Sequence, residues 1–183
     1  MALGLIIGRP LVWGGLAGAV LVLDSAGLLD TMMAQASLIG GTSQATSQEG
    51  MEQDVTVARD KAREYLPRYL AQAVRQPAQW ETQAVLVELS ANGATEQLWI
   101  EDFKPTEGEG FAGTLTNDAQ MLPDLAAGAR VEFSMGQIVD WAYVEKGVGF
   151  GYFTVHASLP YMPAAQAAVA RNFLADRPLP SGW

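Results

Sequence analysis

The stretch that determines the fold covers residues 81–103, ETQAVLVELSANGATEQLWIEDF. Apolar and polar residues alternate over 81–89 and again over 94–103, and this period of two predicts two β-strands. Asn92 and Gly93 lie between them. An Asn-Gly pair is typical of a type I′ turn, because both central residues of that turn have positive φ. The stretch therefore predicts an antiparallel β-hairpin.

Further strands are predicted on the C-terminal side of this hairpin. The candidate segments are residues 110–116, 130–135, 138–144 and 148–157. The connections between them are too short for crossover helices, so antiparallel neighbours are favoured. Together with the hairpin they predict a curved antiparallel sheet of about five or six strands, arranged as a meander.

Helices are predicted on both sides of the sheet segment. From Met51 onwards apolar residues recur every three or four positions, which is typical of an amphipathic helix. Pro67 is expected to kink or break this helix. Residues 162–175 predict a C-terminal helix. The predicted class is α+β, with the N-terminal helix packed on the sheet. The predicted core-facing stripe of that helix is Met51, Val55, Ala58, Ala62, Tyr65, Leu66, Tyr69, Leu70 and Val74.

The N-terminal segment has the pattern of an export leader. Residues 11–23 (LVWGGLAGAVLVL) carry no charge, Arg9 precedes them, and Asp24 and Asp30 follow. This charge order predicts insertion with the N-terminus inside, so the rest of the chain would be exported to the periplasm or anchored facing it. The Ala-Gln-Ala at 34–36 fits a signal peptidase site but lies well beyond the apolar run, so a cleaved signal and an uncleaved anchor are both open. A buried helix of the globular domain is a third interpretation.

Four regions are predicted along the chain. Residues 1–36 form the signal peptide or membrane anchor, and residues 37–50 (SLIGGTSQATSQEG) have the composition of a flexible linker. Residues 51–159 form the globular α+β domain. Residues 160–183 form the C-terminal helix and tail.

Bulk composition excludes several classes of function. The net charge is −9, with 20 acidic against 11 basic residues, and this argues against sequence-independent nucleic-acid binding, which needs a basic surface. The chain has no cysteine, so disulfides, thiolate metal sites and thiol nucleophiles are excluded.

The stretch DWAYVEKGVGFGYFTVH, residues 140–156, holds an acid beside a tryptophan, three alternating glycines and a histidine, residue types that occur in active sites and phosphate loops. A phosphate-binding loop would need a helix directly after its glycines, whereas YFTVH predicts a strand. The glycines are therefore interpreted as part of a hairpin. In it Gly149 and Gly151 leave a notch that Trp141 or Tyr143 could cover.

No catalytic or ligand-binding set emerges from the titratable residues. Asp140 has no second titratable group close by, and a carboxylate that accepts backbone N–H bonds is the favoured interpretation. His156 is the single histidine and is predicted at the rim of the sheet. The acidic group at 101, 102, 107 and 109 lacks the spacing of a calcium loop. Neither a cofactor nor a metal is predicted.

Six sequence segments carry a resemblance to a known family. They are AREYLP at 62–67, LWI at 98–100, GFAGTLTN at 110–117, Leu125 with Gly128 and Val131, IVDWAY at 138–143 and GYFT at 151–154. Through them, residues 51–159 resemble the bacterial family known as domain of unknown function 2314. The chain departs from the family pattern at Ala129 and Ala142. The resemblance implies a small α+β domain, often attached to an export signal, with no established activity or cofactor. Some relatives are suspected of being immunity proteins in toxin systems.

The leading functional hypothesis is a non-enzymatic module that binds another protein on the outer side of the cytoplasmic membrane. Its predicted contact residues are Trp99, Asp140, Trp141, Tyr143 and Tyr152, because exposed aromatics suit protein recognition. Core packing is the alternative for each of them.

Two other hypotheses remain open. The first is an enzyme that uses Asp140 with Glu145, or Glu101 with Asp102, and it predicts a cleft with convergent carboxylates. The second is an accessory subunit of a membrane complex, held by the N-terminal segment.

Overall fold

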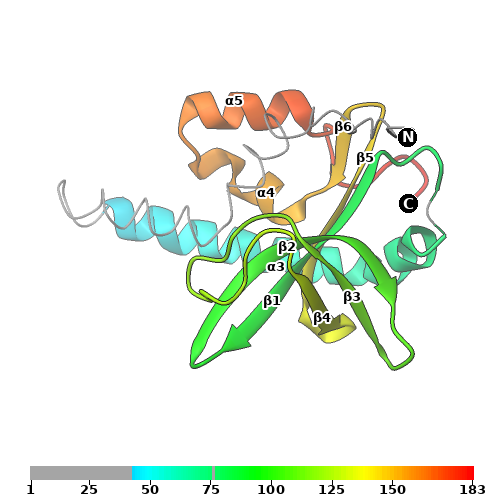
Figure 1. The fold of residues 1–183 in the computed structure, drawn as a ribbon. Helices are drawn as coiled ribbons and strands as arrows, with labels where there is room; N and C mark the ends of the chain where they lie inside the picture. The colour runs from blue at the N-terminus through cyan, green and yellow to red at the C-terminus, as the bar shows by residue number, and fades with distance from the viewer. Residues whose placement is uncertain (1–42, 76) are drawn as a thin grey trace, which may run out of the picture.

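The computed structural model describes residues 43–75 and 77–183, so the predicted leader at 1–36 lies outside the described residues. The protein is α+β, with helices and a six-stranded antiparallel sheet, as predicted (Figure 1). The elements are α3 (Ser43–Ala73), β1 (Thr82–Ala91), β2 (Ala94–Pro105), β3 (Gly110–Leu115), β4 (Arg130–Ser134), η1 (Met135–Gln137), β5 (Ile138–Glu145), β6 (Val148–Gly151), α4 (Phe153–Ser158), η2 (Leu159–Tyr161) and α5 (Ala164–Phe173). Among the described residues no helix has the length and apolarity needed to span a membrane.

The predicted hairpin is confirmed and lies inside the sheet. β1 and β2 pair antiparallel up to Ala91 opposite Ala94. The two turn residues, Asn92 and Gly93, have φ of 52° and 82°. Both values are positive, as the type I′ turn requires.

The strand order is β4-β3-β2-β1-β5-β6. The first four strands form the predicted meander, but β5 pairs with β1 rather than with β4, so the meander prediction is wrong at this point. Only the three residues of η1 join β4 to β5, so the sheet curls to bring the end of β4 close to β1. Gln137 Nε2 closes this corner by donating to the Glu88 carbonyl oxygen at 3.2 Å.

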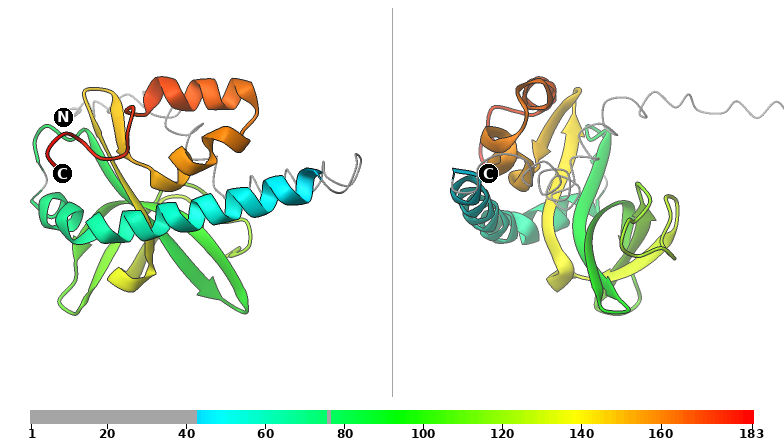
Figure 2. Two further views of the ribbon diagram at one scale, coloured as in Figure 1. Left: turned by 180° about the vertical axis from the view of Figure 1, so that it is seen from behind. Right: turned by 90° about the vertical axis from the view of Figure 1, so that its left-hand side faces the viewer.

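The two faces of the sheet bury different helices, because successive side chains of a strand point to opposite sides. On β1, Val85 and Val87 face the cluster covered by α3. Ala84 and Leu86 face a second cluster, to which α4 and α5 contribute. Figure 2 shows α3 running across one side of the sheet while α4 and α5 lie together beside it.

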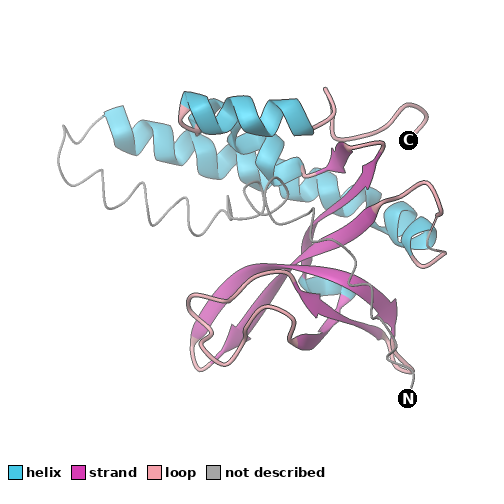
Figure 3. Ribbon diagram, turned by 45° about the horizontal axis from the view of Figure 1, so that its top comes forward, coloured by secondary structure: helices cyan, strands magenta, loops and turns pink. Residues whose placement is uncertain are grey.

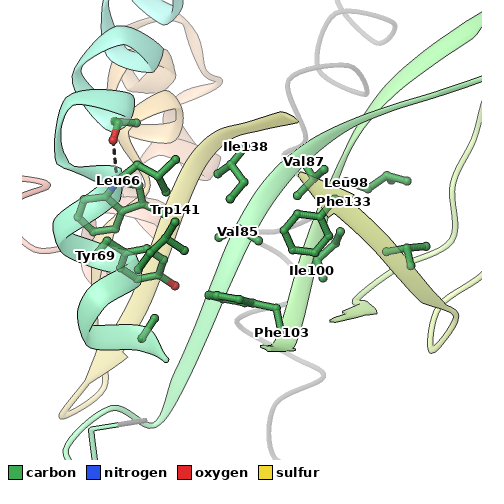
Figure 4. Packing of buried hydrophobic residues seen from close by; sticks show 14 of the residues in the cluster. Leu66, Tyr69, Val85, Val87, Leu98, Ile100, Phe103, Phe133, Ile138 and Trp141 are labelled. Carbon is green, nitrogen blue, oxygen red and sulfur yellow. Dashed lines mark hydrogen bonds between the residues drawn. The ribbon is translucent and has the colours of Figure 1, made fainter. Parts of the chain in front are cut away.

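Hydrogen bonds fix α3 on the sheet in addition to apolar packing. Trp141 Nε1 donates to the Ala62 carbonyl oxygen of α3 at 2.9 Å (Figure 4). The Tyr69 hydroxyl lies 2.9 Å from the carbonyl oxygens of both Ala84 and Ala142 and shares its hydrogen between them. Tyr69 also stacks on Trp141, with ring centroids 4.6 Å apart.

The helix α3 differs from its prediction in three ways. It begins at Ser43, so residues 43–50 of the predicted linker are helical. It continues through Pro67 without a break, and Figure 2 shows its last turns at an angle to the rest. Val74, predicted in the core stripe, is 44% exposed. Asp54 on the first half of α3 accepts a hydrogen bond from the Tyr161 hydroxyl at 2.7 Å, which links this helix to η2.

Candidate functional site

The five predicted contact residues are all buried. Their exposed fractions are 3% for Trp99, 0% for Asp140 and Trp141, 3% for Tyr143 and 4% for Tyr152. Trp141 and Tyr143 belong to the cluster under α3, whereas Trp99 and Tyr152 pack against each other in the second cluster. The predicted aromatic contact surface is therefore wrong, and the core alternative describes these side chains.

Asp140 joins the end of the sheet to α4. Its carboxylate accepts hydrogen bonds from the backbone N–H groups of Trp141 at 2.8 Å, Phe153 at 3.2 Å and Thr154 at 2.8 Å. The Thr154 hydroxyl donates a fourth bond at 2.7 Å. Two of these N–H groups belong to the first turn of α4, which has no partners for them within the helix. Asp140 thus holds the adjoining segment through backbone N–H bonds, as the favoured interpretation predicted.

The same carboxylate is sealed from solvent. Burial raises the pKa of Asp140 to about 6, while its four hydrogen bonds act in the opposite direction. A general acid or base must reach a substrate. The Asp140 side chain has no exposed surface and its oxygens already accept four hydrogen bonds, so it cannot reach a substrate in this conformation. The pKa of Asp140 is thus raised because the side chain is buried in a structural role.

The predicted strand over 148–157 is wrong in its second half. β6 ends at Gly151, and α4 begins two residues later. Gly151 and Tyr152 have φ of +80° and +49°, and these left-handed conformations turn the chain out of the sheet. Asp140 then accepts the N–H groups that start the helix, so a carboxylate 13 residues away overrides the local strand propensity.

The glycines of this segment provide room for two different rings. A Cβ on Gly151 would overlap the Trp141 carbonyl and come within 2.8 Å of its ring, as the predicted notch requires. A Cβ on Gly149 would lie 2.6 Å from the ring of Phe173. Trp141 therefore covers one glycine, while α5 covers the other.

Asp140 and Glu145, the first carboxylate pair of the enzyme hypothesis, do not converge. Asp140 and Glu145 lie five residues apart on β5, a distance of about 16 Å along an extended strand and on opposite faces. Glu101 has a raised pKa because of burial and of repulsion from Asp102. Asp102 sits at a bulge with φ of 50°. Within the described ranges, no cluster of three or more His, Asp and Glu side chains could hold a metal ion.

One concave feature that reaches the surface is a groove between α3 and α4, with a volume of about 650 Å³. We call it the α3–α4 groove. Figure 3 shows the helices that surround it gathered at one end of the sheet. Its lining residues are Asp54, Val57, Ala58, Asp60, Lys61, Glu64, Phe153, His156, Ala157, Pro160 and Pro178.

His156 forms part of this groove and is more enclosed than a rim histidine. Its Nε2 atom is buried and has no hydrogen-bond partner. Burial lowers the pKa of His156, so the imidazole is uncharged at neutral pH. The wall that α4 contributes is consequently apolar and neutral.

The groove was not predicted, although one signal for it exists in the sequence. Val57 lies off the core-facing stripe of α3 and is 63% exposed. A single exposed aliphatic residue is common on protein surfaces, so Val57 indicates a contact surface only together with the neighbouring apolar residues of the groove. The opposite wall had no signal, because residues 153–157 were predicted as strand.

Comparison with known proteins gives a family but no function. The family model described as "Uncharacterized protein conserved in bacteria (DUF2314)" matches residues 44–169. "Uncharacterized protein YegJ" of Escherichia coli (strain K12) is 26% identical over 87 residues, which are 48% of this chain and 56% of that protein. The aligned part thus spans little more than half of this relative. No solved structure matches.

The family match is wider than the resemblance over 51–159. It takes in the first turns of α3 and the first half of α5, and both walls of the α3–α4 groove lie within it apart from Pro178. Because the match covers most of the sequence and the residues that build both helical faces, the chain belongs to the DUF2314 family of bacterial proteins.

Proposed function

We propose that this chain is a non-enzymatic protein-binding module and that the α3–α4 groove is its contact surface. The observation that carries the proposal is that one open groove brings exposed aliphatic surface at Val57 together with the half-buried Ala157 and the exposed Pro160. An exposed apolar patch rimmed by polar residues is characteristic of protein interaction sites. The enzyme hypothesis has less support for its first carboxylate pair, because Asp140 is sealed from solvent and lies far along β5 from Glu145.

The proposal includes a location outside the cytoplasm. The uncharged run at 11–23, with Arg9 before it and acidic residues after it, supports export to the periplasm or an anchor in the cytoplasmic membrane. In either case the groove would be presented to partners on the outer side of that membrane. An immunity-like role, in which the partner is a toxin, agrees with what the family resemblance implies.

Site-specific photocross-linking tests the contact surface. A benzophenone amino acid replaces Val57 in the groove, and the control replaces Val74, which directly follows α3, is 44% exposed and does not line the groove. Irradiation of living cells is expected to give a discrete adduct with another protein from position 57 and none from position 74. Absence of an adduct at 57 at native expression levels, or equal adducts at both positions, would contradict the proposal.

Export needs its own measurement. Fractionation of cells and N-terminal sequencing of the mature protein are expected to place it in the periplasm or membrane, starting either at Met1 or just after Ala36. A protein recovered only from the cytoplasm would refute this part of the proposal and leave the groove untouched.

A second candidate function is an accessory subunit of a membrane complex, and the run at 11–23 favours it. Blue-native electrophoresis of detergent extracts is expected to show a stable high-mass band that contains this chain. Migration as a free monomer alone would exclude a stable complex.

A further inference from the structure

We infer that the partner segment that enters the α3–α4 groove is basic and amphipathic, with an apolar anchor flanked by lysine or arginine. The apolar anchor would pack over Val57 and Ala157, and the basic groups would meet the carboxylates of α3. This inference rests on the proposed function and specifies the chemistry of the partner.

Charge along the groove is distributed asymmetrically. The α3 wall contributes three carboxylates, Asp54, Asp60 and Glu64, against one cation, Lys61. The α4 wall and the C-terminal tail contribute Phe153, His156, Ala157, Pro160 and Pro178, none of which is charged at neutral pH. The groove therefore has one acidic wall and one apolar wall, and an amphipathic segment complements both walls.

Two of the three carboxylates, Asp60 and Glu64, remain accessible to a partner because their present contacts are weak, whereas Asp54 accepts a hydrogen bond from the Tyr161 hydroxyl at 2.7 Å. Glu64 pairs with Lys61 at 2.8 Å, but these side chains are 59% and 47% exposed. Asp60 lies 4.0 Å from Arg63 and is 74% exposed. Exposed pairs of this kind contribute little to stability, so cations of a partner can compete for both carboxylates.

The same charges argue against other occupants. The chain's own apolar run at 11–23 has no cation within it and is followed by Asp24 and Asp30, which the acidic wall would repel. A second copy of this acidic groove would meet like charge. Anionic lipid surfaces are disfavoured for the same reason. A basic segment of another protein is the occupant that the charge pattern favours.

Two synthetic peptide probes test this chemistry. They share the same leucine positions on a helical pattern, and their polar positions carry lysine in one peptide and glutamate in the other. Binding to the folded domain is measured by fluorescence anisotropy. The groove variant is Asp60→Asn with Glu64→Gln, and the matched control is Glu107→Gln with Glu109→Gln, which also removes two exposed carboxylates. Circular dichroism confirms that both variants fold.

We expect the lysine peptide to bind and the glutamate peptide not to bind. The groove variant should weaken the lysine peptide about tenfold, as expected for two surface ion pairs at up to about 0.7 kcal/mol each, and the control about twofold or less. Equal weakening in both variants would show a general charge effect and overturn the inference, as would equal binding of the two peptides.

Failure of the inference is distinguishable from failure of the proposed function. If cross-linking from position 57 captures a partner whose cross-linked segment is acidic or uncharged, the binding role stands and the basic-segment inference is refuted. If position 57 captures no protein, the proposed function itself fails.

Discussion

Replacement of Asp140 by alanine tests the central structural claim, that a buried carboxylate holds α4 on the sheet. The change removes the acceptor of four hydrogen bonds, three of them from backbone N–H groups. A buried donor without a partner costs about 1 to 3 kcal/mol. At about 1.2 kcal/mol for each of the four, the variant loses about 5 kcal/mol of unfolding free energy.

A second effect opposes this loss at neutral pH. The pKa of Asp140 is raised from 3.8 to about 6, so ionisation is less favourable in the folded state than in the unfolded state. About two pKa units correspond to about 3 kcal/mol, which the wild-type protein loses above pH 6 and the alanine variant does not. The net loss on replacement is therefore about 2 kcal/mol at pH 7.

The sign of the pH dependence follows from proton binding. Between pH 4 and pH 6 the folded protein holds a proton on Asp140 that the unfolded chain has released, so the contribution of this group to stability falls as pH rises. The difference between wild type and Asp140→Ala should consequently grow from about 2 kcal/mol at pH 7 to about 5 kcal/mol at pH 4.

Urea unfolding followed by tryptophan fluorescence at several pH values between 4 and 7 measures this difference. Asp118→Ala is the matched control, because Asp118 also accepts a backbone N–H bond, from Ala127 at 2.8 Å, but does so on the surface. Its expected loss is below about 1 kcal/mol. A difference for Asp140→Ala that grows as pH rises would refute the reasoning, because it would mean that the hydrogen bonds outweigh burial. A loss below about 0.5 kcal/mol at every pH would show that the carboxylate does not hold the helix.

Other positions give further expectations. Gly151→Ala should lower the free energy of unfolding in urea by more than about 3 kcal/mol, because a Cβ there overlaps Trp141. Gly147 also has positive φ, but a Cβ there meets open space, so Gly147→Ala should lower it by about 1 kcal/mol. The lowered pKa of His156 means that the folded state binds fewer protons there than the unfolded chain, so wild type should lose more stability than His156→Gln as pH falls from 7 to 5; equal losses would contradict this. Trp183→Ala should cost about 1 to 2 kcal/mol in thermal unfolding, because this ring packs 5.3 Å from Trp141, and an unchanged transition would show that the C-terminus does not contribute.

The parts of the fold that were predictable are those set by local pattern. The β1–β2 hairpin is specified by alternation and by Asn92-Gly93, both of which act within a few residues. The pairing of β5 with β1 was not predictable, because it depends on the curl of the whole sheet. Alternation indicates that a segment is a strand and which side chains share a face, but not which strand lies beside it.

The candidate site shows the same division. The role of Asp140 as an acceptor of backbone N–H groups could be predicted, because an isolated acid on an apolar strand needs donors. Its main hydrogen-bond partners, Phe153 and Thr154, could not be predicted, because their segment has β-branched and aromatic residues that favour a strand. The aromatic residues were interpreted as a surface since composition alone does not distinguish an exposed ring from a buried one.

The two walls of the α3–α4 groove differ in how they are stabilised. One wall is α3, a helix of 31 residues, whose buried residues between Met51 and Ala73 pack against the rest of the fold. The other is α4, with six residues, and an isolated helix of that length is not stable in water. Asp140 fixes the first turn of α4 by accepting the backbone N–H groups of Phe153 and Thr154. Because Asp140 is fully buried, the shape of the groove depends on a residue that no partner could touch. The burial of Asp140, within the stretch 140–156, is thus explained by its structural role, without a role in catalysis. It follows that Asp140→Ala should weaken partner capture at position 57 even under conditions where the domain stays folded, whereas Asp118→Ala should not.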